Sequence, residues 1–389
     1  GLEPGDADLG PGEASEDPDR PAPSSNVRDG RALGAAPWVA TTYFAEGLPY
    51  SLVHQVAAQL FTSLGASLEA TGLTSLYGLA WNLKFAWSPI VDRVGSMRRW
   101  IVSLQLVLAL LVLVLAIPAG DGDLAWIARI LVPVAIVAAT HDIAIDGFYL
   151  RALGKNDQAT LSGFRVAAYR VALLVGNGLL VAIAGLLSWR LAFFVAAGLF
   201  VVLAMWHAWT LPRPTTDSKE GRAKPGSYAE ALLTFVRQPS GAWFLAFILC
   251  FRAGDALMFA MGTPLLRDLG LDTETRGFVS GVLGTLASIV GAIVGGVIVG
   301  KLSLTRALFP IAAAQSLAIP LYAVMAFARP SLPIIAAIVV VEQLVAGVGT
   351  AAFTVFILRR CLGQYKASHF AVATAIMSVS ATLAGGDRA

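Results

Sequence analysis

Charged residues are scarce in this sequence of 389 residues. Lys, Arg, Asp and Glu make up only 14% of it, whereas hydrophobic residues make up 57%. A soluble domain has about 25% charged and about 45–50% apolar residues, so an ordinary soluble fold is excluded. The apolar residues occur in long blocks separated by short charged loops. This pattern is typical of a polytopic membrane protein, whose partner is the lipid bilayer.

Cysteine, histidine and excess charge of one sign are also scarce. Cys250 and Cys361 both lie in apolar runs, which favours neither a disulfide framework nor a metal site. No second His or Cys stands near His141, so we interpret it as a hydrogen-bonded interior histidine rather than a metal ligand. The net charge of +3 is small and forms no basic stripe. We therefore predict no cofactor, no metal and no nucleic-acid partner.

Long apolar runs are what the sequence has in abundance. A helix needs about 20 apolar residues to cross a bilayer. Ten runs reach that length, at about 36–62, 72–90, 100–118, 125–150, 160–187, 189–211, 241–267, 277–300, 305–328 and 331–358, and an eleventh occupies 367–384. The Gly-rich run from Gly281 to Gly300 has the small-residue spacing that lets helices pack closely in lipid. The sequence thus predicts an all-α integral membrane protein.

Hydrophilic segments divide the chain. Residues 1–35 are rich in Pro, Gly, Asp and Glu, so we expect a disordered acidic tail, and they lack the pattern of a signal peptide. The loop from Pro212 to Tyr228 lies in a linker at 212–240. This linker joins an N-terminal six-helix half at 36–211 to a C-terminal half at 241–389. Because the chain starts at Gly1 and stops within an eleventh run, we expect a fragment whose second half is truncated in or after helix 11.

Lys and Arg are shared unequally between alternate loops. One set holds Arg93, Arg98, Arg99, Arg151, Lys155, Arg213, Lys219, Arg222, Lys224, Arg237, Lys301, Arg306, Arg359, Arg360 and Lys366, and the other holds Arg190, Arg267, Arg276 and Arg329. Cytoplasmic loops carry the excess of Lys and Arg, whereas Asp and Glu count little. We predict that the N-terminus and the central loop are cytoplasmic.

The two halves resemble each other weakly. The stretch from Phe44 to Gly47 and the stretch from Arg252 to Asp255 each open a helix, about 205 residues apart, and each is followed by a second helix and a basic turn. Parallel six-helix halves are the construction of one large class of transporters, with the binding site between the halves.

The stretch from Thr140 to Arg151 carries two carboxylates within an apolar run. Asp142 and Asp146 are four residues apart and share one helical face. A carboxylate in a membrane costs about 2.5–3.5 kcal/mol on insertion scales, which marks a substrate or proton pathway by default. A purely structural ion pair is the alternative. Lys84 poses the same question, since it can serve a buried function or extend toward the interface.

The turn from Asp92 to Arg99 has the form D-R-x-G-x-x-R-R. It resembles the cytoplasmic signature loop of the major facilitator superfamily, whose acid and bases form ion pairs that latch the cytoplasmic gate. A tight turn with orienting arginines is the alternative interpretation. The resemblance implies a gate formed by Asp92, Arg93, Arg98 and Asp146, because Asp146 lies near the cytoplasmic end of its helix.

Further segments resemble the AmpG-type muropeptide permeases. They are Thr140–Asp146, Lys84–Arg93, Gly254–Ala256, Ala292–Gly296, Leu302–Leu308, Glu342–Phe353 and Ala367–Ala371. The resemblance spans about Ala36 to Ala384 and implies a proton-driven carrier in the bacterial inner membrane that imports anhydro-muropeptides. Glu46 and Arg252 depart from the family pattern, as does the number of helices. The related acetyl-coenzyme A transporters share part of these features, so acetyl-coenzyme A or another organic anion is an alternative solute.

The ionisable residues within the spans form an unequal set. The acids are Glu46, Asp142, Asp146, Asp255 and Glu342, and the bases are Lys84, Arg165, Arg170 and Arg252. Four pairs leave one acid without a base, and burial favours the neutral form of such an acid. All five acids fall on helices one, four, seven and ten, which line the central cavity in this superfamily.

We assign these residues as follows. Arg252 and Asp255 are three residues apart and can pair on one face. Asp146 reaches Arg93 or Arg98 as a latch, and Lys84 and Arg170 remain for Glu46, Asp142 and Glu342. We predict that Asp142 is the proton site, with His141 beside it, and that Arg170 and Arg252 contact substrate carboxylates. In the alternative, Arg165 sits at the interface and the unequal count is accidental.

Two interpretations of other classes remain. Asp142 and Asp146 have the spacing with which membrane transferases of the polyprenyl type hold Mg²⁺. Such enzymes need a second aspartate-rich motif, which the sequence lacks, and a requirement for Mg²⁺ would reveal one. The chain can also be a non-functional fragment, which the genomic sequence beyond Ala389 would decide.

The predicted orientation can be tested by cysteine labelling. Single cysteines at Thr216 and Asp121 should react from opposite sides of the membrane, because the loops that carry them belong to opposite sets. Labelling of both positions by an impermeant reagent in intact cells would refute this topology.

Overall fold

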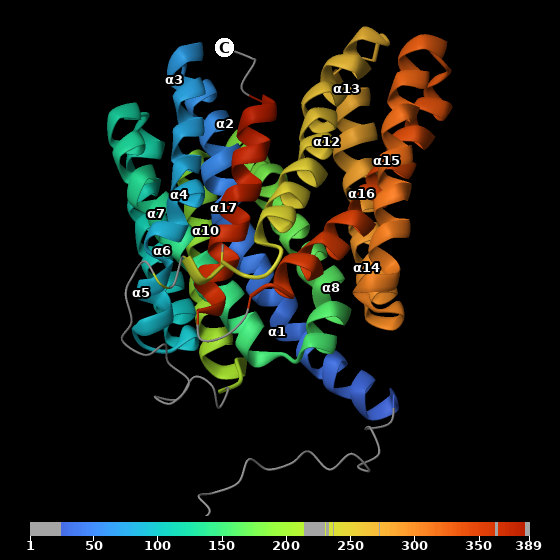
Figure 1. Ribbon diagram of the computed structural model, residues 1–389. Coiled ribbons are helices and arrows are strands. Elements are labelled where there is room, and N and C mark those ends of the chain that lie inside the picture. The colour runs from blue at the N-terminus through green and yellow to red at the C-terminus, as the bar shows by residue number, and fades with distance from the viewer. Residues whose placement is uncertain are drawn as a thin grey trace, which may run out of the picture.

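In the part of the chain that it describes, the computed structural model consists of helices joined by short turns and loops (Figure 1). It describes residues 25–213, 230, 233–235, 237–271, 273–361 and 365–385, without the side chains at 25–33, 68, 72, 252–261, 263–264, 273–274, 277 and 378–385. All eleven predicted apolar runs are helical, so the predicted all-α fold is confirmed.

Seven helical segments within these residues are long and apolar enough to cross a membrane. They are α6 (Met97–Asp121), α7 (Leu124–Ala152), the continuous segment Lys155–Leu186, α10 (Trp189–Thr210), Phe278–Leu302, α15 (Leu304–Ala328) and α16 (Leu332–Leu358). The segment Lys155–Leu186 comprises α8 (Lys155–Leu174), a π-helix (Val175–Leu180) and α9 (Val181–Leu186). Phe278–Leu302 comprises most of a π-helix (Gly277–Gly284) and all of α14 (Thr285–Leu302).

The remaining runs are less regular. The first comprises α1 (Ser25–Ser51), a π-helix η1 (Leu52–Val56) and α2 (Ala57–Ser63), so it begins earlier than the predicted residue 36. The second is broken into α3 (Leu68–Leu73), the 3-10 helix η2 (Thr74–Gly78), α4 (Leu79–Leu83), the 3-10 helix η3 (Lys84–Ala86) and α5 (Ser88–Arg93). Pro89 stands in the first turn of α5, where a proline without an amide hydrogen is tolerated. The last two are α12 (Gly241–Asp268) and α17 (Lys366–Gly385).

Short polar segments close the connections between helices. The Ser96 side chain caps α6 by accepting from the Arg99 amide, and Asp123 caps α7 by accepting from the Trp126 amide. Gly122, between these helices, has a left-handed φ of 76°, which glycine adopts without strain. These caps let successive spans reverse direction within a few residues.

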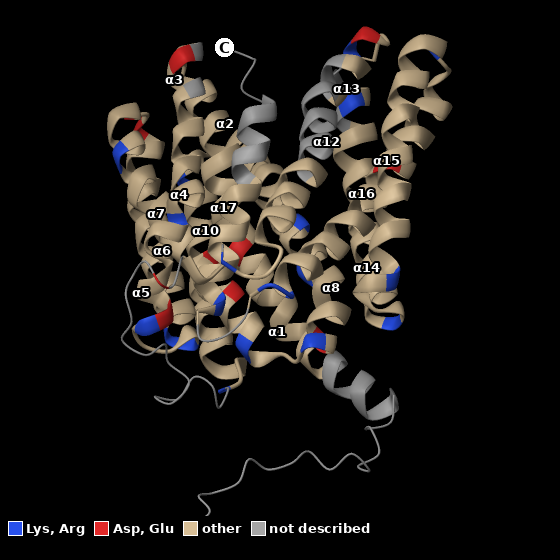
Figure 2. Ribbon diagram, viewed as in Figure 1, with Lys and Arg blue, Asp and Glu red and all other residues tan. Residues whose placement is uncertain are grey.

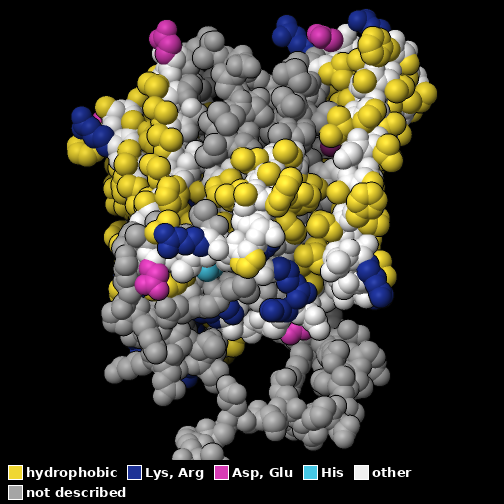
Figure 3. Space-filling model, viewed as in Figure 1, with side chains coloured by type: hydrophobic (Ala, Val, Ile, Leu, Met, Phe, Trp, Pro, Cys, Tyr) yellow, Lys and Arg dark blue, Asp and Glu magenta, His cyan; other side chains and the backbone are white. Residues whose placement is uncertain are grey.

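The helices stand side by side and form one bundle (Figure 1). On the face shown in Figure 3, hydrophobic side chains cover the middle of the bundle, and most charged side chains lie toward its two ends. Among the described residues, one buried core joins the two parts of the sequence, since Trp38 and Phe148 share it with Phe244, Phe353 and Phe370. A second core lies wholly within residues 48–200. The predicted linker at 212–240 lies largely outside the described residues. Of the tail predicted at 1–35, residues 1–24 also lie outside them, whereas residues 25–35 form the start of α1 and are helical.

Helix α14 packs closely against two neighbours through glycine. A Cβ atom added at Gly291 would collide with the Leu344 carbonyl of α16, and one added at Gly295 would lie 2.7 Å from the Val348 oxygen. On the other side, α14 meets Gly163 of α8. This confirms the predicted role of the Gly-rich run in close helix packing.

A matched pair of substitutions tests this packing. Gly291→Ala should lower the apparent melting temperature in detergent, because forcing a methyl group into a close contact costs roughly 1–3 kcal/mol. Gly281→Ala is the control, because Gly281 has open space around it on the same helical segment. Equal melting temperatures for the two variants would contradict the close approach of α14 and α16.

Candidate functional site

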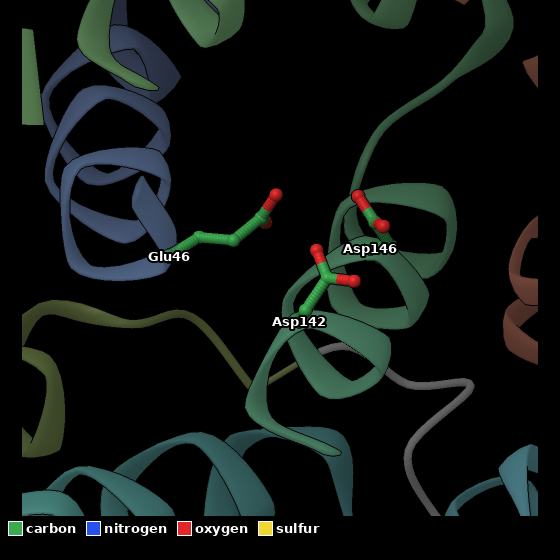
Figure 4. A group of neighbouring side chains, drawn as sticks. All are labelled: Glu46, Asp142 and Asp146. Atoms are coloured by element: carbon green, nitrogen blue, oxygen red, sulfur yellow. The ribbon is translucent and has the colours of Figure 1, made fainter. Parts of the chain in front are cut away.

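Helix α7 brings the two predicted aspartates into the interior. Every residue from His141 to Leu150 is buried, and Asp142 and Asp146 are only 5% and 2% exposed. Their four-residue spacing directs both carboxylates to one side of α7, where α1 approaches (Figure 4). Figure 2 shows some acidic and basic residues between the two ends of the bundle.

Lys84 forms an ion pair with Asp142. The Lys84 ammonium contacts Oδ2 of Asp142, and Lys84 is 4% exposed. It extends from η3, the 3-10 segment that interrupts the second run. Lys84 therefore does not extend toward the interface, and the alternative that it does so is wrong. The break in the helix positions a long basic side chain toward α7.

Arg165 forms an ion pair with Asp146. Nη2 of Arg165 lies 2.7 Å from Oδ1 of Asp146, which also accepts from the Tyr43 hydroxyl at 2.9 Å. The guanidinium lies over the Tyr43 ring at 4.4 Å and the Phe370 ring at 4.8 Å. The expected pairing of Asp146 with Arg93 or Arg98 is wrong, because Arg165 on α8 is the base that faces it. Arg165 is 8% exposed, so it does not sit at the interface.

Glu46 supplies a third carboxyl from α1. Carboxylate oxygens of Glu46, Asp142 and Asp146 all lie within 4.8 Å of one another (Figure 4). Oε2 of Glu46 is buried and has no hydrogen-bond partner among the described residues. Together with Lys84 and Arg165, these acids form what we call the buried charge cluster. It contains three acids and two bases.

The composition of the cluster bears on cation binding. Three close carboxylates can hold a metal ion when all are free to coordinate. Here an ammonium contacts Asp142 and a guanidinium contacts Asp146, so two of the three negative charges are already neutralised. The remaining carboxyl carries one uncompensated negative charge, which favours a singly charged cation over Mg²⁺. The arrangement therefore does not favour the transferase alternative.

His141 is buried, but among the residues described its ring lacks the hydrogen bonds that we expected. It is fully buried on α7, and neither ring nitrogen has a hydrogen-bond partner within the described part of the chain. The expected interior position is found, but the expected hydrogen bonds are not. His141 is adjacent to Asp142 in sequence, yet its side chain is not part of the buried charge cluster.

Asp92 joins three helices near the end of the bundle where α1 begins. Its Oδ1 accepts from Arg151 of α7 at 2.6 Å, and its Oδ2 accepts from the amide and hydroxyl of Ser368 at 2.8 and 2.5 Å. The carboxylate thereby caps the first turn of α17, where the helix dipole favours negative charge. The sequence predicted the acid of this motif but neither of these partners.

The other predicted gate residues have different contacts. The Arg93 guanidinium lies 5.9 Å from the centre of the Tyr365 ring, and Arg98 donates to the Ala208 carbonyl at the end of α10. Neither contact involves Asp146. Arg93 and Arg98 thus contact two different segments, near Tyr365 and at the end of α10.

The remaining predicted residues lie outside the buried charge cluster. Arg170 of α8 donates to the Ser288 hydroxyl of α14. Glu342 of α16 accepts from Tyr322 at 3.3 Å and from Gln343 at 2.8 Å. Arg252 and Asp255 lie on α12, among the side chains that the structure does not describe. Tyr43, Arg151 and Ser368 were not among the predicted site residues, because polar residues of these types are common at helix faces and ends.

Comparison with known proteins identifies the class. A sequence model of the Major Facilitator Superfamily matches residues 37–386, and the chain belongs to this superfamily of membrane transporters. The chain is 29% identical over 349 residues to the anhydromuropeptide permease of Escherichia coli K12, covering 88% of this chain and 71% of that protein. It is 21% identical over 347 residues to a protein named putative transporter AmpG 4 of Rickettsia conorii, covering 86% of this chain and 84% of that one.

Solved structures share the fold. The transporter FucP in its outward conformation superposes with a TM-score of 0.66 at 12% identity, covering 91% of this chain and 89% of that one. A bacterial homologue of the iron transporter ferroportin, in an outward-facing state, gives a TM-score of 0.66 at 14% identity and covers 91% and 90%. The predicted major facilitator fold and the likeness to AmpG-type permeases are confirmed, and the relatives are transporters, not enzymes.

The pair formed by Lys84 and Asp142 can be tested by a double-mutant cycle. Lys84→Met should reduce the yield and melting temperature of folded protein, because breaking a buried ion pair costs about 3–5 kcal/mol. Adding Asp142→Asn should restore most of both, because no uncompensated charge is then left inside. Size-exclusion chromatography over a temperature series measures the effect. A Lys84→Met protein as stable as the wild type would argue against the pair.

Proposed function

We propose that this transporter imports anhydro-muropeptides across a bacterial inner membrane, driven by the entry of protons. The substrate assignment is supported by the likeness to the anhydromuropeptide permease over most of the chain. The coupling assignment rests on one observation, which is the excess of one carboxyl in the buried charge cluster. The N-terminus and the end of the bundle that holds Asp92 then lie on the cytoplasmic side.

Within this proposal, Glu46 replaces Asp142 as the group that carries the proton. Asp142 faces the Lys84 ammonium and Asp146 faces the Arg165 guanidinium, so each keeps its charge compensated. Oε2 of Glu46 is buried without a hydrogen-bond partner among the described residues. A protonated Glu46 can donate to Asp142 after a small movement, because their carboxylate oxygens lie within 4.8 Å of each other. A neutral Glu46 leaves the cluster with two acids balanced by two bases.

Proton release then disturbs this balance. When Glu46 loses its proton, three negative charges face two positive ones in a region without bulk water, which is unfavourable. The uncompensated negative charge can be neutralised if Lys84 or Arg165 leaves its aspartate partner and contacts Glu46. Lys84 lies in the broken second run, which also contains Asp92, and Asp146 lies on α7, which also carries Arg151. Such an exchange therefore moves both segments that form the contact between Asp92 and Arg151. Protonation and opening of this end are thereby coupled.

The solute is large and polar and carries peptide carboxylates. A guanidinium can bind a carboxylate through two hydrogen bonds. Arg170 is half-buried on α8 and reaches toward α14, which belongs to the other part of the sequence. We therefore propose Arg170 as one carboxylate contact, with Arg252 of α12 as the second.

Transport by purified protein in liposomes tests the proposal. Wild-type protein should accumulate a GlcNAc-anhydroMurNAc peptide under an inward proton gradient, with no accumulation of acetyl-coenzyme A. Accumulation of acetyl-coenzyme A alone would move the protein to the neighbouring family. Accumulation that follows a sodium gradient instead of a proton gradient would reject proton coupling.

Glu46→Gln tests the proton site in the same liposomes. The amide mimics a permanently protonated carboxyl, so exchange of labelled for unlabelled solute should continue while accumulation under a proton gradient is lost. Glu69→Gln is the control, since Glu69 is exposed in α3. Full accumulation by Glu46→Gln would return the assignment to Asp142, whose Asn variant should then lose gradient-driven uptake.

A further inference from the structure

A group of aromatic side chains lies beside the buried charge cluster. Tyr50 is one helical turn after Glu46 on α1, and its ring stacks on His54 with centroids 3.8 Å apart and planes inclined by 14°. Trp81 of α4 meets both rings edge-on, at 5.3 Å from Tyr50 and 4.7 Å from His54. Tyr169 of α8 lies 5.7 Å from Tyr50. These four residues, from three helices, form what we call the aromatic cluster.

Local backbone structure sets this arrangement. His54 lies within the π-helix η1, which interrupts the first run. Single-turn π-helices occur frequently at functional sites, because the extra residue redirects side chains. His54 is thereby placed over Tyr50, and its Nδ1 lies 3.1 Å from the Tyr50 carbonyl oxygen. A contact with a carbonyl requires Nδ1 to donate, so Nε2 of the neutral ring is an acceptor.

The aromatic cluster packs against the second buried core, to which Trp81 belongs and which Tyr50 contacts. Tyr169 is followed by Arg170, whose side chain reaches Ser288 of α14, so this part of α8 adjoins the second half of the sequence. Gly47 lies against Tyr169, since a Cβ added there would be 2.7 Å from the Tyr169 carbonyl oxygen. Tyr50, His54 and Tyr169 nevertheless keep part of their surface exposed, whereas Trp81 is 8% exposed.

We propose that the aromatic cluster is a binding site for the pyranose rings of the transported solute. This inference rests on the proposed function. The C–H face of a sugar ring carries partial positive charge and stacks on the negative face of an aromatic ring. Hydroxyl groups around the ring are donors for His54 Nε2, and tyrosine hydroxyls add donors and acceptors. Arg170, next in sequence to Tyr169, would hold a carboxylate of the attached peptide.

This placement links recognition to coupling. Tyr50 and Glu46 project from the same face of α1, one turn apart. A sugar held by the aromatic cluster therefore lies next to the carboxyl that carries the proton, and it shields that carboxyl from water. Binding of the sugar would favour the protonated, neutral form of Glu46, so that solute and proton move together.

Binding measurements with divided solutes test the site. The probes are a GlcNAc-anhydroMurNAc peptide, the same disaccharide without peptide, and the free peptide. Wild-type protein in detergent should bind the disaccharide, and Tyr50→Leu should weaken that binding by about tenfold, the loss of one good aromatic contact. Trp81→Leu should weaken it as well, because the buried Trp81 packs against the rings of Tyr50 and His54 and holds them in place. Trp81→Phe should retain most of it. Trp209→Leu, at an 88% exposed position on α10, is the matched control.

A spectroscopic measurement keeps the test independent of folding defects in the variants. Saturation of the aromatic protons of the wild-type protein should transfer to the ring C–H protons of the disaccharide. Binding of the disaccharide without this transfer, or equal binding by Trp81→Leu, Tyr50→Leu and Trp209→Leu, would overturn the aromatic site and leave the proposed function standing. If the protein bound the complete peptide-bearing solute but not the free disaccharide, the aromatic site would likewise be overturned and the proposed function would stand. A wild-type protein that binds none of the sugar-containing probes would overturn both.

Discussion

Compensation of charge inside the bundle is the constraint on which the rest of the structure depends. Charges in a bilayer are tolerated mainly when they pair or face a cavity, because no water is present to solvate them. Asp142 and Asp146 meet this requirement by drawing Lys84 and Arg165 toward α7. The two ion pairs thereby fix the positions of the second run and of α8 relative to α7. Breaking either pair would leave a buried charge, which is far more costly than never having had one.

Helix α7 connects this interior chemistry to the end of the bundle. Asp142, Asp146 and Arg151 follow one another along a single helix, and Arg151 holds Asp92, which in turn caps α17. A rigid helix transmits displacement over such a distance, since its residues move together. A change in pairing at the charge cluster can therefore alter the contact that joins α5 and α7 to α17.

Irregular helical segments position two of the polar side chains described above. Lys84 extends from a 3-10 segment and His54 from a π-helix, whereas the long regular helices α6 and α10 mainly build the core. Non-helical or strained backbone at membrane depth persists where it is buried in protein. The backbone departures of the first two runs thus have a common consequence, because they direct polar and aromatic side chains toward α7 and α8.

The sequence by itself determined the class of fold and where its helices lie. Hydropathy alone requires helices in lipid, because each backbone amide must be satisfied within its own segment, and the spacing of Asp142 and Asp146 fixed their common face. Only the tertiary structure decided the partners. Arg165 lies on a different helix from Asp146, and Ser368 lies far along the chain from Asp92. Nothing in the local sequence ranks Arg165 above Arg93 as the base for Asp146. The choice depends on helix rotation and on close packing through glycines such as Gly163 and Gly291, which are set by the whole bundle rather than by any one run.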